Sequence, residues 1–366
     1  MNLDDLTSFR QMDAQHMREE LDSLPDRFEA AWQQGLAFAF PTTYSQVRQI
    51  VVAGMGNSAV AGDMVAVLAK ETGKLPLIVH RGYDLPAYAA GEDTLVVIIT
   101  HGGKSEEALS VLEGAQARGA QILALTANAA LCQHIQAMGR PYASACLCPH
   151  EGDSRPALAW YFGLLLALAY RLALLPDPSA DIAEVVGTLR TRVPVLGVEG
   201  RVVKNPAKRL AGQLIGRIPV IYGAGILAPV AHRWKMQLNE NAKTWAEWDE
   251  LPEVNHNAAA GIIFPRQLMT KLSVVILSSP QFDHPRIAIR QTLTKDLYLQ
   301  QGIAVDVVKM RGHSPIGQML SGIQYGDYVS YYVAMSYGVD PTPTPALAEI
   351  RERLASAQDV VQDSHE

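Results

Sequence analysis

Residues 49–70 read QIVVAGMGNSAVAGDMVAVLAK, and residues 218–243 read IPVIYGAGILAPVAHRWKMQLNENAK. Each stretch begins with a short run rich in Val and Ile, passes through a glycine turn, and ends in a longer segment of helical pattern. Short β-branched runs that stop at glycine favour strands, and longer periodic segments favour helices. Because the same plan occurs twice, the sequence indicates a tandem duplication.

The segments that follow these two stretches also share one plan. Residues 93–128 and residues 271–310 each predict a strand, a turn of small or polar residues, a helix of about four turns and a second strand. Near-continuous apolar strands that alternate with helices are typical of parallel sheets with helices on both faces. The predicted fold class is therefore α/β, with two tandem αβα sandwich domains built on parallel sheets, and with additional N- and C-terminal helices.

The predicted chain has four parts. A helical lead covers residues 1–34, the first sandwich domain covers 35–185, the second covers 190–338, and a C-terminal helix with its tail covers 339–366. The proline-rich stretch LPDPSADIAE indicates the boundary between the two sandwich domains. The prolines of DPTPTP set the start of the last helix, because proline suits the first helical turn.

The composition of the chain excludes several classes of protein. A chain of 366 residues is longer than one hydrophobic core usually holds, and a net charge of −6 provides no basic surface for nucleic acid. The chain has only three cysteines, and an odd number cannot pair completely, which argues against a disulfide framework. So few cysteines fit a reducing compartment. The N-terminus lacks a basic region followed by an apolar one, so we expect no signal peptide and a cytoplasmic protein.

The most apolar run in the chain, residues 157–175, has nearly the length of a membrane span. Arg171 interrupts this run, and Arg155 lies just before it. A single apolar run with charged residues at its edges favours a buried helix of a large domain. We therefore expect no association with a membrane.

Two glycine turns predict an anion site, because ligands of open α/β sheets bind at the carboxyl ends of the strands. Each turn opens a helix whose bare amides can hold an anion at the positive helix end, although each turn alone would be an ordinary capped turn. Neither is a Gly-x-Gly-x-x-Gly motif, and no acidic residue follows to hold a ribose, which favours a phosphosugar over NAD. The candidate phosphate-binding residues are Gly56, Asn57, Ser58, Thr100, Gly102, Lys104 and Ser105.

Residues 239–257, NENAKTWAEWDELPEVNHN, concentrate side chains that suit proton transfer. A partly buried carboxylate such as Glu240 can move a proton between sugar carbons, and a histidine such as His256 can open a sugar ring near neutral pH. Arg155 can stabilise the charge of an enediolate as a fixed cation. The alternative is a solvated surface loop. Glu240 and His256 are too far apart for one helix face, so a loop or a dimer contact would have to bring them together.

In combination, the motifs GMGNSAVAGD, NENAK, NHN and GDYVSYYVAMSYGVDPTP resemble those of the bifunctional phosphoglucose/phosphomannose isomerase family, whose members consist of two sugar isomerase (SIS) domains. The resemblance runs from about residue 30 to about residue 355. It implies the interconversion of glucose 6-phosphate and mannose 6-phosphate with fructose 6-phosphate. It also implies that no metal or other cofactor is used, and that a homodimer forms in which the histidine reaches across the interface.

The resemblance further implies roles for single residues. Glu240 matches the family's catalytic base, His256 matches its ring-opening histidine, and Arg155 matches an arginine near the reacting carbons. The positions at which the family carries phosphate-binding hydroxyls are occupied by Ser58, Thr100 and Ser105.

The sequence departs from the family pattern in two places. The family's Ser-Tyr-Ser-Gly-Asn-Thr is Thr-His-Gly-Gly-Lys-Ser here, so Gly102 replaces a hydroxyl and Lys104 replaces an asparagine. In the last helix Arg351 stands for a lysine; arginine keeps the charge but is no proton shuttle at neutral pH. These departures leave open a non-catalytic phosphosugar-binding protein and an isomerase of a different phosphosugar.

Overall fold

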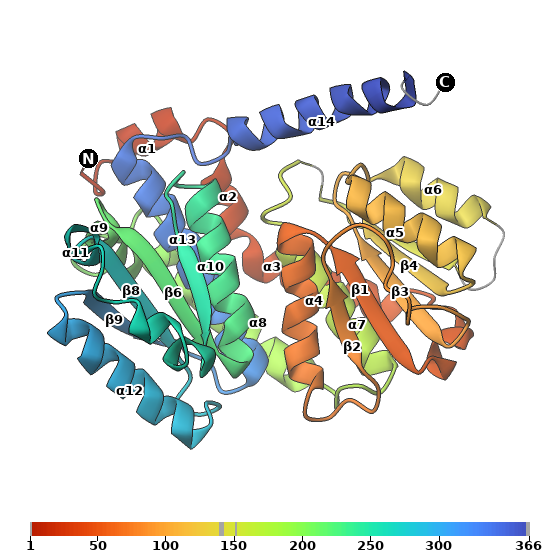
Figure 1. The fold of residues 1–366 in the computed structure, drawn as a ribbon, viewed down its shortest axis with the longest axis horizontal. Coiled ribbons are helices and arrows are strands. Elements are labelled where there is room, and N and C mark those ends of the chain that lie inside the picture. The colour runs from red at the N-terminus through yellow and green to blue at the C-terminus, as the bar shows by residue number, and fades with distance from the viewer. Residues whose placement is uncertain (1, 139–142, 151, 364–366) are drawn as a thin grey trace.

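A computed structural model describes residues 2–138, 143–150 and 152–363, and Figure 1 shows their arrangement. The strands are β1 (Gln49–Gly54), β2 (Leu77–His80), β3 (Thr94–Ile99), β4 (Gln121–Thr126), β5 (Ala143–Leu147), β6 (Ile218–Ala224), β7 (Glu247–Leu251), β8 (Leu272–Ser278) and β9 (Ala304–Lys309). The helices are α1 (Leu6–Met12), α2 (Met17–Asp22), α3 (Leu24–Ala37), α4 (Gly56–Ala69), α5 (Glu106–Ala117), α6 (Ala129–Ala137), α7 (Leu158–Arg171), α8 (Ser179–Leu196), α9 (Pro206–Leu214), α10 (Ala228–Glu240), α11 (Arg266–Met269), α12 (Pro285–Gln300), α13 (Pro315–Tyr337) and α14 (Pro345–Asp363).

The strands form two parallel sheets with the same topology. The first has the order β2-β1-β3-β4-β5, and the second has the order β7-β6-β8-β9. In both sheets the first strand lies between the second and the third, and every pair of neighbours is parallel. The predicted α/β class with two tandem sheets is therefore confirmed.

Helices cover both faces of the first sheet. Val52 and Val97 pack into a core that also holds residues of α4 and α7, whereas Val51 and Val96 pack with residues of α5 and α6. This alternation follows from the strand geometry, in which successive side chains point to opposite faces. Burial on both faces explains the continuous Val/Ile runs from which the strands were predicted.

The second sheet is covered in the same way and shares one core with the first. Ile221 and Val275 pack with α10 and α13 in the same hydrophobic cluster that holds Val52 of the first sheet. The opposite face, with Tyr222 and Val274, packs against α12. In Figure 1 the helices α10 and α4 accordingly lie between the two sheets. The predicted boundary at 185–190 falls inside α8, and the domain bounds stay a prediction.

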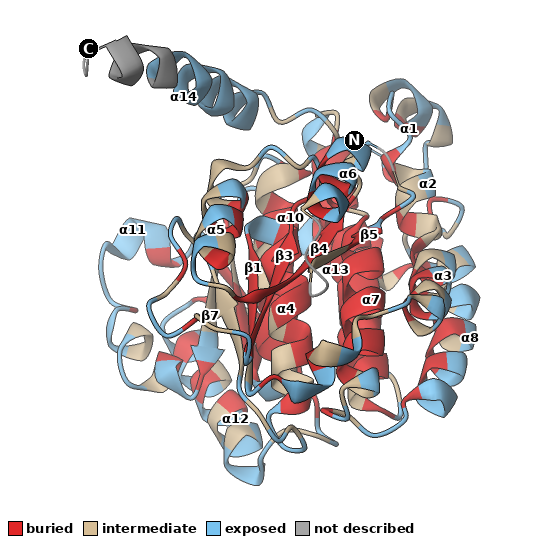
Figure 2. Cartoon of the chain, turned by 90° about the vertical axis from the view of Figure 1, so that its right-hand side faces the viewer, coloured by how far each residue is buried: buried red, intermediate tan, exposed pale blue. Residues whose placement is uncertain are grey.

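The apolar run at residues 157–175 forms the helix α7, in which every residue from Leu158 to Ala169 is buried. Figure 2 shows this helix in the interior, beside α4. The prediction of a buried helix is confirmed. Within the residues that the structure describes, no helix has the length and apolarity needed to cross a membrane.

The polar region at residues 239–257 contains a strand that the sequence did not reveal. Its residues Glu247–Leu251 form β7, which pairs only with β6 at the edge of the second sheet. An edge strand leaves one side of its backbone and many of its side chains in solvent, so it needs no apolar run. Here Glu247 is exposed and Leu251 is buried.

The last helix, α14, extends away from the rest of the molecule (Figures 1 and 2). Every side chain from Pro345 to Ala357 is exposed. Its orientation therefore depends mainly on the segment that precedes it.

Candidate active site

The two predicted phosphate turns lie side by side. β1 and β3 are neighbouring parallel strands in which Gly54 pairs with Ile99, so the turns that follow them emerge at the same edge of the sheet. The hydroxyl oxygens of Thr100 and Ser105 lie 3.1 Å apart within one hydrogen bond. Ser58 is buried in the first turn of α4. The hydroxyls of both turns and the starts of α4 and α5 thus lie at one edge of the first sheet.

The two glycines of the second turn, Gly102 and Gly103, differ in whether a side chain would fit at their position. Gly103 has a φ of 67°, and a Cβ at this position would come within 2.7 Å of the side chain of Asn128, so only glycine fits. Around Gly102, by contrast, a Cβ would meet nothing within 4 Å. Lys104 is exposed, and its ammonium makes no hydrogen bond or ion pair with the part of the chain that the structure describes.

Arg155 is buried, with 1% of its surface exposed, and all of its N–H donors are engaged. Nε donates a hydrogen bond of 2.8 Å to one carboxylate oxygen of Asp153, and Nη2 donates to the other. Nη1 donates to the side-chain oxygen of Asn241 at 2.7 Å and to the carbonyl of Pro341 at 2.8 Å. Nη2 also donates to the carbonyl of Thr342 at 2.6 Å. The guanidinium therefore organises the surrounding loops.

Asp153 is the carboxylate partner of Arg155 in this cluster. Burial pushes the pKa of Asp153 up, but the hydrogen bonds and the charge of Arg155 push it down further, so that the pKa lies below its usual range. Asp153 thus stays ionised and holds the Arg155 guanidinium in place.

Glu240, the last residue of α10, lies next to this cluster. Its side chain is 23% exposed, and its Oε2 lies 3.9 Å from Nε of Arg155. Burial raises the pKa of Glu240 above its ordinary value, although the charges of Arg155, Arg233 and, more weakly, Arg351 oppose the rise. A carboxylate that is partly accessible and has a raised pKa suits a general base.

The same helix contributes a second buried arginine. Arg233 is 1% exposed; its Nε and Nη2 donate to the carboxylate of Asp327 at 3.1 and 2.9 Å. Nη2 also donates to the carbonyl of Arg155 at 3.1 Å, and Nη1 donates to the side-chain oxygen of Asn57 in the first phosphate turn. Arg233 therefore joins the helix of Glu240 to the phosphate turn on the other sheet.

Arg233 and Asp327 were not predicted as site residues from the sequence. The stretch around Arg233 predicts a helix surface, and this was wrong for Arg233 and Trp234, which are both buried. One signal was available: Arg233 lies two helical turns before Glu240, on the same face of one helix. Asp327 belongs to the motif GDYVSYYVAMSYGVDPTP but had been given no role.

Lys243 was likewise missed. It has a φ of 53°, which is unusual for a residue with a side chain. Its Nζ donates to the carbonyls of Asn241, Asp340 and Pro341 at 3.2, 2.7 and 2.9 Å. Burial and the nearby charge of Arg155 lower the pKa of Lys243 to about 8.

The structure does not bring His256 together with Glu240 by any hydrogen bond or ion pair between described residues. His256 follows the short 3-10 helix Glu253–Asn255 after β7, and its side chain is exposed. Arg351 is exposed on α14, yet its charge reaches Glu240, since it lowers the pKa of that carboxylate.

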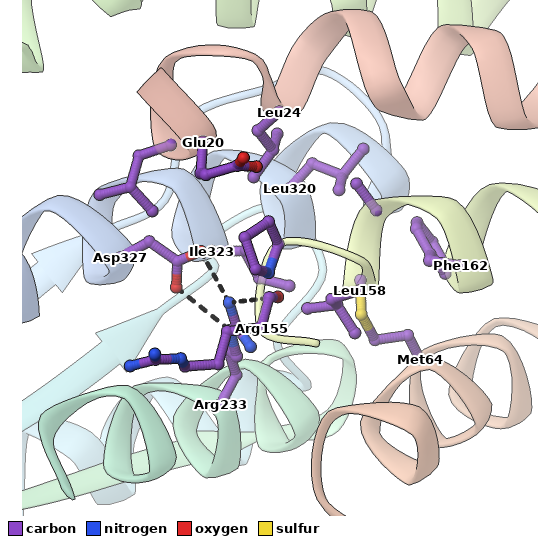
Figure 3. A pocket seen from close by; sticks show the side chains of 13 residues that line it. Glu20, Leu24, Met64, Arg155, Leu158, Phe162, Arg233, Leu320, Ile323 and Asp327 are labelled. Atoms are coloured by element: carbon purple, nitrogen blue, oxygen red, sulfur yellow. Dashed lines mark hydrogen bonds and ion pairs between the residues drawn. The ribbon is translucent and has the colours of Figure 1, made fainter. Parts of the chain in front are cut away.

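A small cavity lies behind the arginines, and Figure 3 shows its lining. It is bounded on one side by Arg155, Arg233 and Asp327, and on the other by apolar side chains that include Leu24 and Phe162. Its volume of about 10 Å³ suffices for about one water molecule. A sugar phosphate would not fit there.

The chain is similar in sequence to known phosphosugar isomerases along most of its length. Residues 203–354 match the model of the bacterial phospho-glucose isomerase C-terminal SIS domain, and residues 43–134 match that of the SIS domain. A bifunctional phosphoglucose/phosphomannose isomerase of Caldicellulosiruptor bescii is 33% identical over 94% of this chain and 100% of its own length. Another, of Aquifex aeolicus, is 31% identical over 83% of this chain and 90% of its own length.

Solved structures show the same fold at lower identity. The C-terminal domain of glucosamine-fructose-6-phosphate aminotransferase from Francisella tularensis matches with a TM-score of 0.69 and 15% identity, over 88% of this chain and 97% of that chain. At this identity the likeness concerns the fold alone.

Proposed function

Because the chain belongs to the bifunctional phosphoglucose/phosphomannose isomerase family, we propose that it interconverts glucose 6-phosphate and mannose 6-phosphate with fructose 6-phosphate through a cis-enediol. The observation that carries the proposal is the position of Glu240. It is a partly exposed carboxylate with a raised pKa, held beside buried cations on a helix that Arg233 ties to the phosphate turns. Glu240 is the base that moves a proton between C2 and C1.

The substrate is anchored by its phosphate. The hydroxyls of Thr100, Ser105 and Ser58 and the free amides of two helix ends bind the phosphate oxygens. This remote binding energy holds the sugar carbons at Glu240. Gly56, Asn57, Gly102 and Lys104 complete the same two turns.

Arg155 acts as an electrostatic and positioning group. Its donors are already bound to Asp153, Asn241 and backbone carbonyls, so it has none left for the substrate. Its charge lies close enough to Glu240 to favour the ionised base. The guanidinium of Arg351 is exposed and has no hydrogen-bond partner among the residues that the structure describes. We therefore assign to Arg351 the direct stabilisation of the enediolate charge.

His256 opens the sugar ring from a second copy of the chain. Its imidazole is exposed, and among the described residues it makes no hydrogen bond or ion pair with Glu240. Three large apolar side chains that follow it in the sequence, Ile263, Phe264 and Leu268, are 50%, 69% and 44% exposed. Several exposed apolar side chains in one short segment are typical of an interface. A homodimer would bury them and deliver the histidine to the partner's site.

The alternative of a different phosphosugar rests on Gly102 and Lys104, which change the groups offered next to the substrate. A non-catalytic sugar-phosphate binder would not need the raised pKa of Glu240. We therefore favour the hexose 6-phosphate isomerase.

The proposal is tested by a coupled assay of the EDTA-treated protein on fructose 6-phosphate, with separate detection of the two aldoses. We expect both glucose 6-phosphate and mannose 6-phosphate, and a loss of at least about a thousandfold in Glu240→Gln, because an amide cannot accept the proton that the carboxylate moves. A Glu349→Gln variant, which alters an exposed carboxylate of α14, should keep full activity. Formation of neither aldose by the unmodified protein would contradict the proposal.

A further inference from the structure

Lys243 is placed as a structural clamp. Its ammonium has three N–H donors, and each has a backbone carbonyl within hydrogen-bond distance: Asn241, Asp340 and Pro341. The residue holds this position in a left-handed backbone conformation, at a φ of 53°. Such conformations cluster at functional sites, where the surroundings enforce them.

Arg155 grips the same segment from the other side. Nη1 of Arg155 and Nζ of Lys243 donate to one and the same carbonyl, that of Pro341, at 2.8 and 2.9 Å. Nη2 of Arg155 holds the next carbonyl, that of Thr342, and Nζ of Lys243 holds the preceding one, that of Asp340. Two cations beside Glu240 thus fix three consecutive carbonyls.

The clamped segment is the root of α14. The chain runs from residue 340 through alternating prolines into the helix, which begins at Pro345. Since every side chain of α14 from Pro345 to Ala357 is exposed, packing does not orient this helix. The position of Arg351 therefore depends on the conformation of residues 340–344, which precede the helix.

We propose that Lys243 is a positioning residue of the isomerase site: with Arg155 it fixes residues 340–342 beside Glu240, and through them it orients α14, which carries Arg351. This inference rests on the proposed function, in which Arg351 stabilises the enediolate. It assigns no proton transfer to Lys243, whose donors all point to the backbone.

Hydrogen–deuterium exchange of the full chain tests the clamp without reference to activity. In Lys243→Met we expect faster exchange in peptides that cover residues 339–350, where the amides of Leu347 and Ala348 bond to the carbonyl of Thr344. The matched control is Lys204→Met, which removes an exposed lysine. Unchanged exchange of residues 339–350 in Lys243→Met would overturn the proposal.

A double-mutant cycle tests the functional consequence. We expect Lys243→Met and Arg351→Met each to lower kcat about tenfold, with little change in KM, because the phosphate turns lie on the other sheet. The double variant should lose no more than the worse single variant, since Lys243 acts through Arg351. Multiplied losses would show that Lys243 acts independently.

The two failures are distinguishable. If the unmodified protein isomerises no hexose 6-phosphate, the proposed function fails, and the exchange measurement still decides whether Lys243 holds the root of α14.

Discussion

At the scale of single residues, the candidate site contains two kinds of side chain: buried cations that hold the surrounding backbone in place, and partly exposed groups that can reach a substrate. Arg155 and Lys243 have their donors bound to the protein, whereas Glu240 and Arg351 keep exposed atoms. A site of this kind keeps its reacting groups preorganised, because their supports are fixed by buried hydrogen bonds. Gly102 also changes the site by a single residue, since it stands where the family carries a hydroxyl in the second phosphate turn.

Gly102→Ser should strengthen binding of the phosphate group. A Cβ at this position meets nothing within 4 Å, so serine fits without displacing a neighbour, and a hydrogen bond to the phosphate would be worth about a tenfold gain in affinity. The measurement is the KM for fructose 6-phosphate together with inhibition by inorganic phosphate. Gly212→Ser, at another open glycine, is the control. An unchanged or weaker affinity in Gly102→Ser would mean that this position does not face the phosphate.

At the scale of elements, α10 matters most, because it carries both Arg233 and Glu240. The sequence predicted this helix and its glycine turn from the apolar strand before it. It could not reveal that Arg233 is buried, since the partner that makes burial possible, Asp327, lies on α13, far along the chain. The edge strand β7 escaped prediction for a related reason: pairing on one side of a sheet allows polar residues that carry no strand pattern.

Removing one partner of the Arg233–Asp327 pair should lower the free energy of unfolding more than replacing both partners by apolar residues. Asp327→Asn leaves a buried cation without its counter-charge, which costs about 3–5 kcal/mol of unfolding free energy. The double variant Arg233→Met/Asp327→Leu removes both charges and should recover part of that loss. Urea denaturation measures both values. The control is Arg353→Met, which breaks an exposed pair with Glu349 and should have little effect.

If the double variant were as unstable as Asp327→Asn, the loss would come from packing or from the bond to Asn57 rather than from the unpaired charge.

At the scale of the whole molecule, the two sheets are joined by one core. The cluster that contains Val52 and Val60 of the first sheet and its helix also contains Ile221 and Val230 of the second. The phosphate turns belong to the first sheet and Glu240 belongs to the second, so this shared core fixes the spacing between substrate anchor and base. The duplication was legible in the sequence because both halves repeat one pattern. The shared core was not, because a helix that is apolar all round, such as α7, does not indicate which of its faces meets the other half of the chain.

Isotope exchange decides whether Glu240 moves a proton through an enediol. The EDTA-treated protein would convert fructose 6-phosphate in deuterium oxide, and the aldose products would be analysed for deuterium at C2. We predict solvent deuterium at C2 of both aldoses and no product from Glu240→Gln. Aldoses formed without solvent deuterium at C2, or formed equally well by Glu240→Gln, would contradict the mechanism.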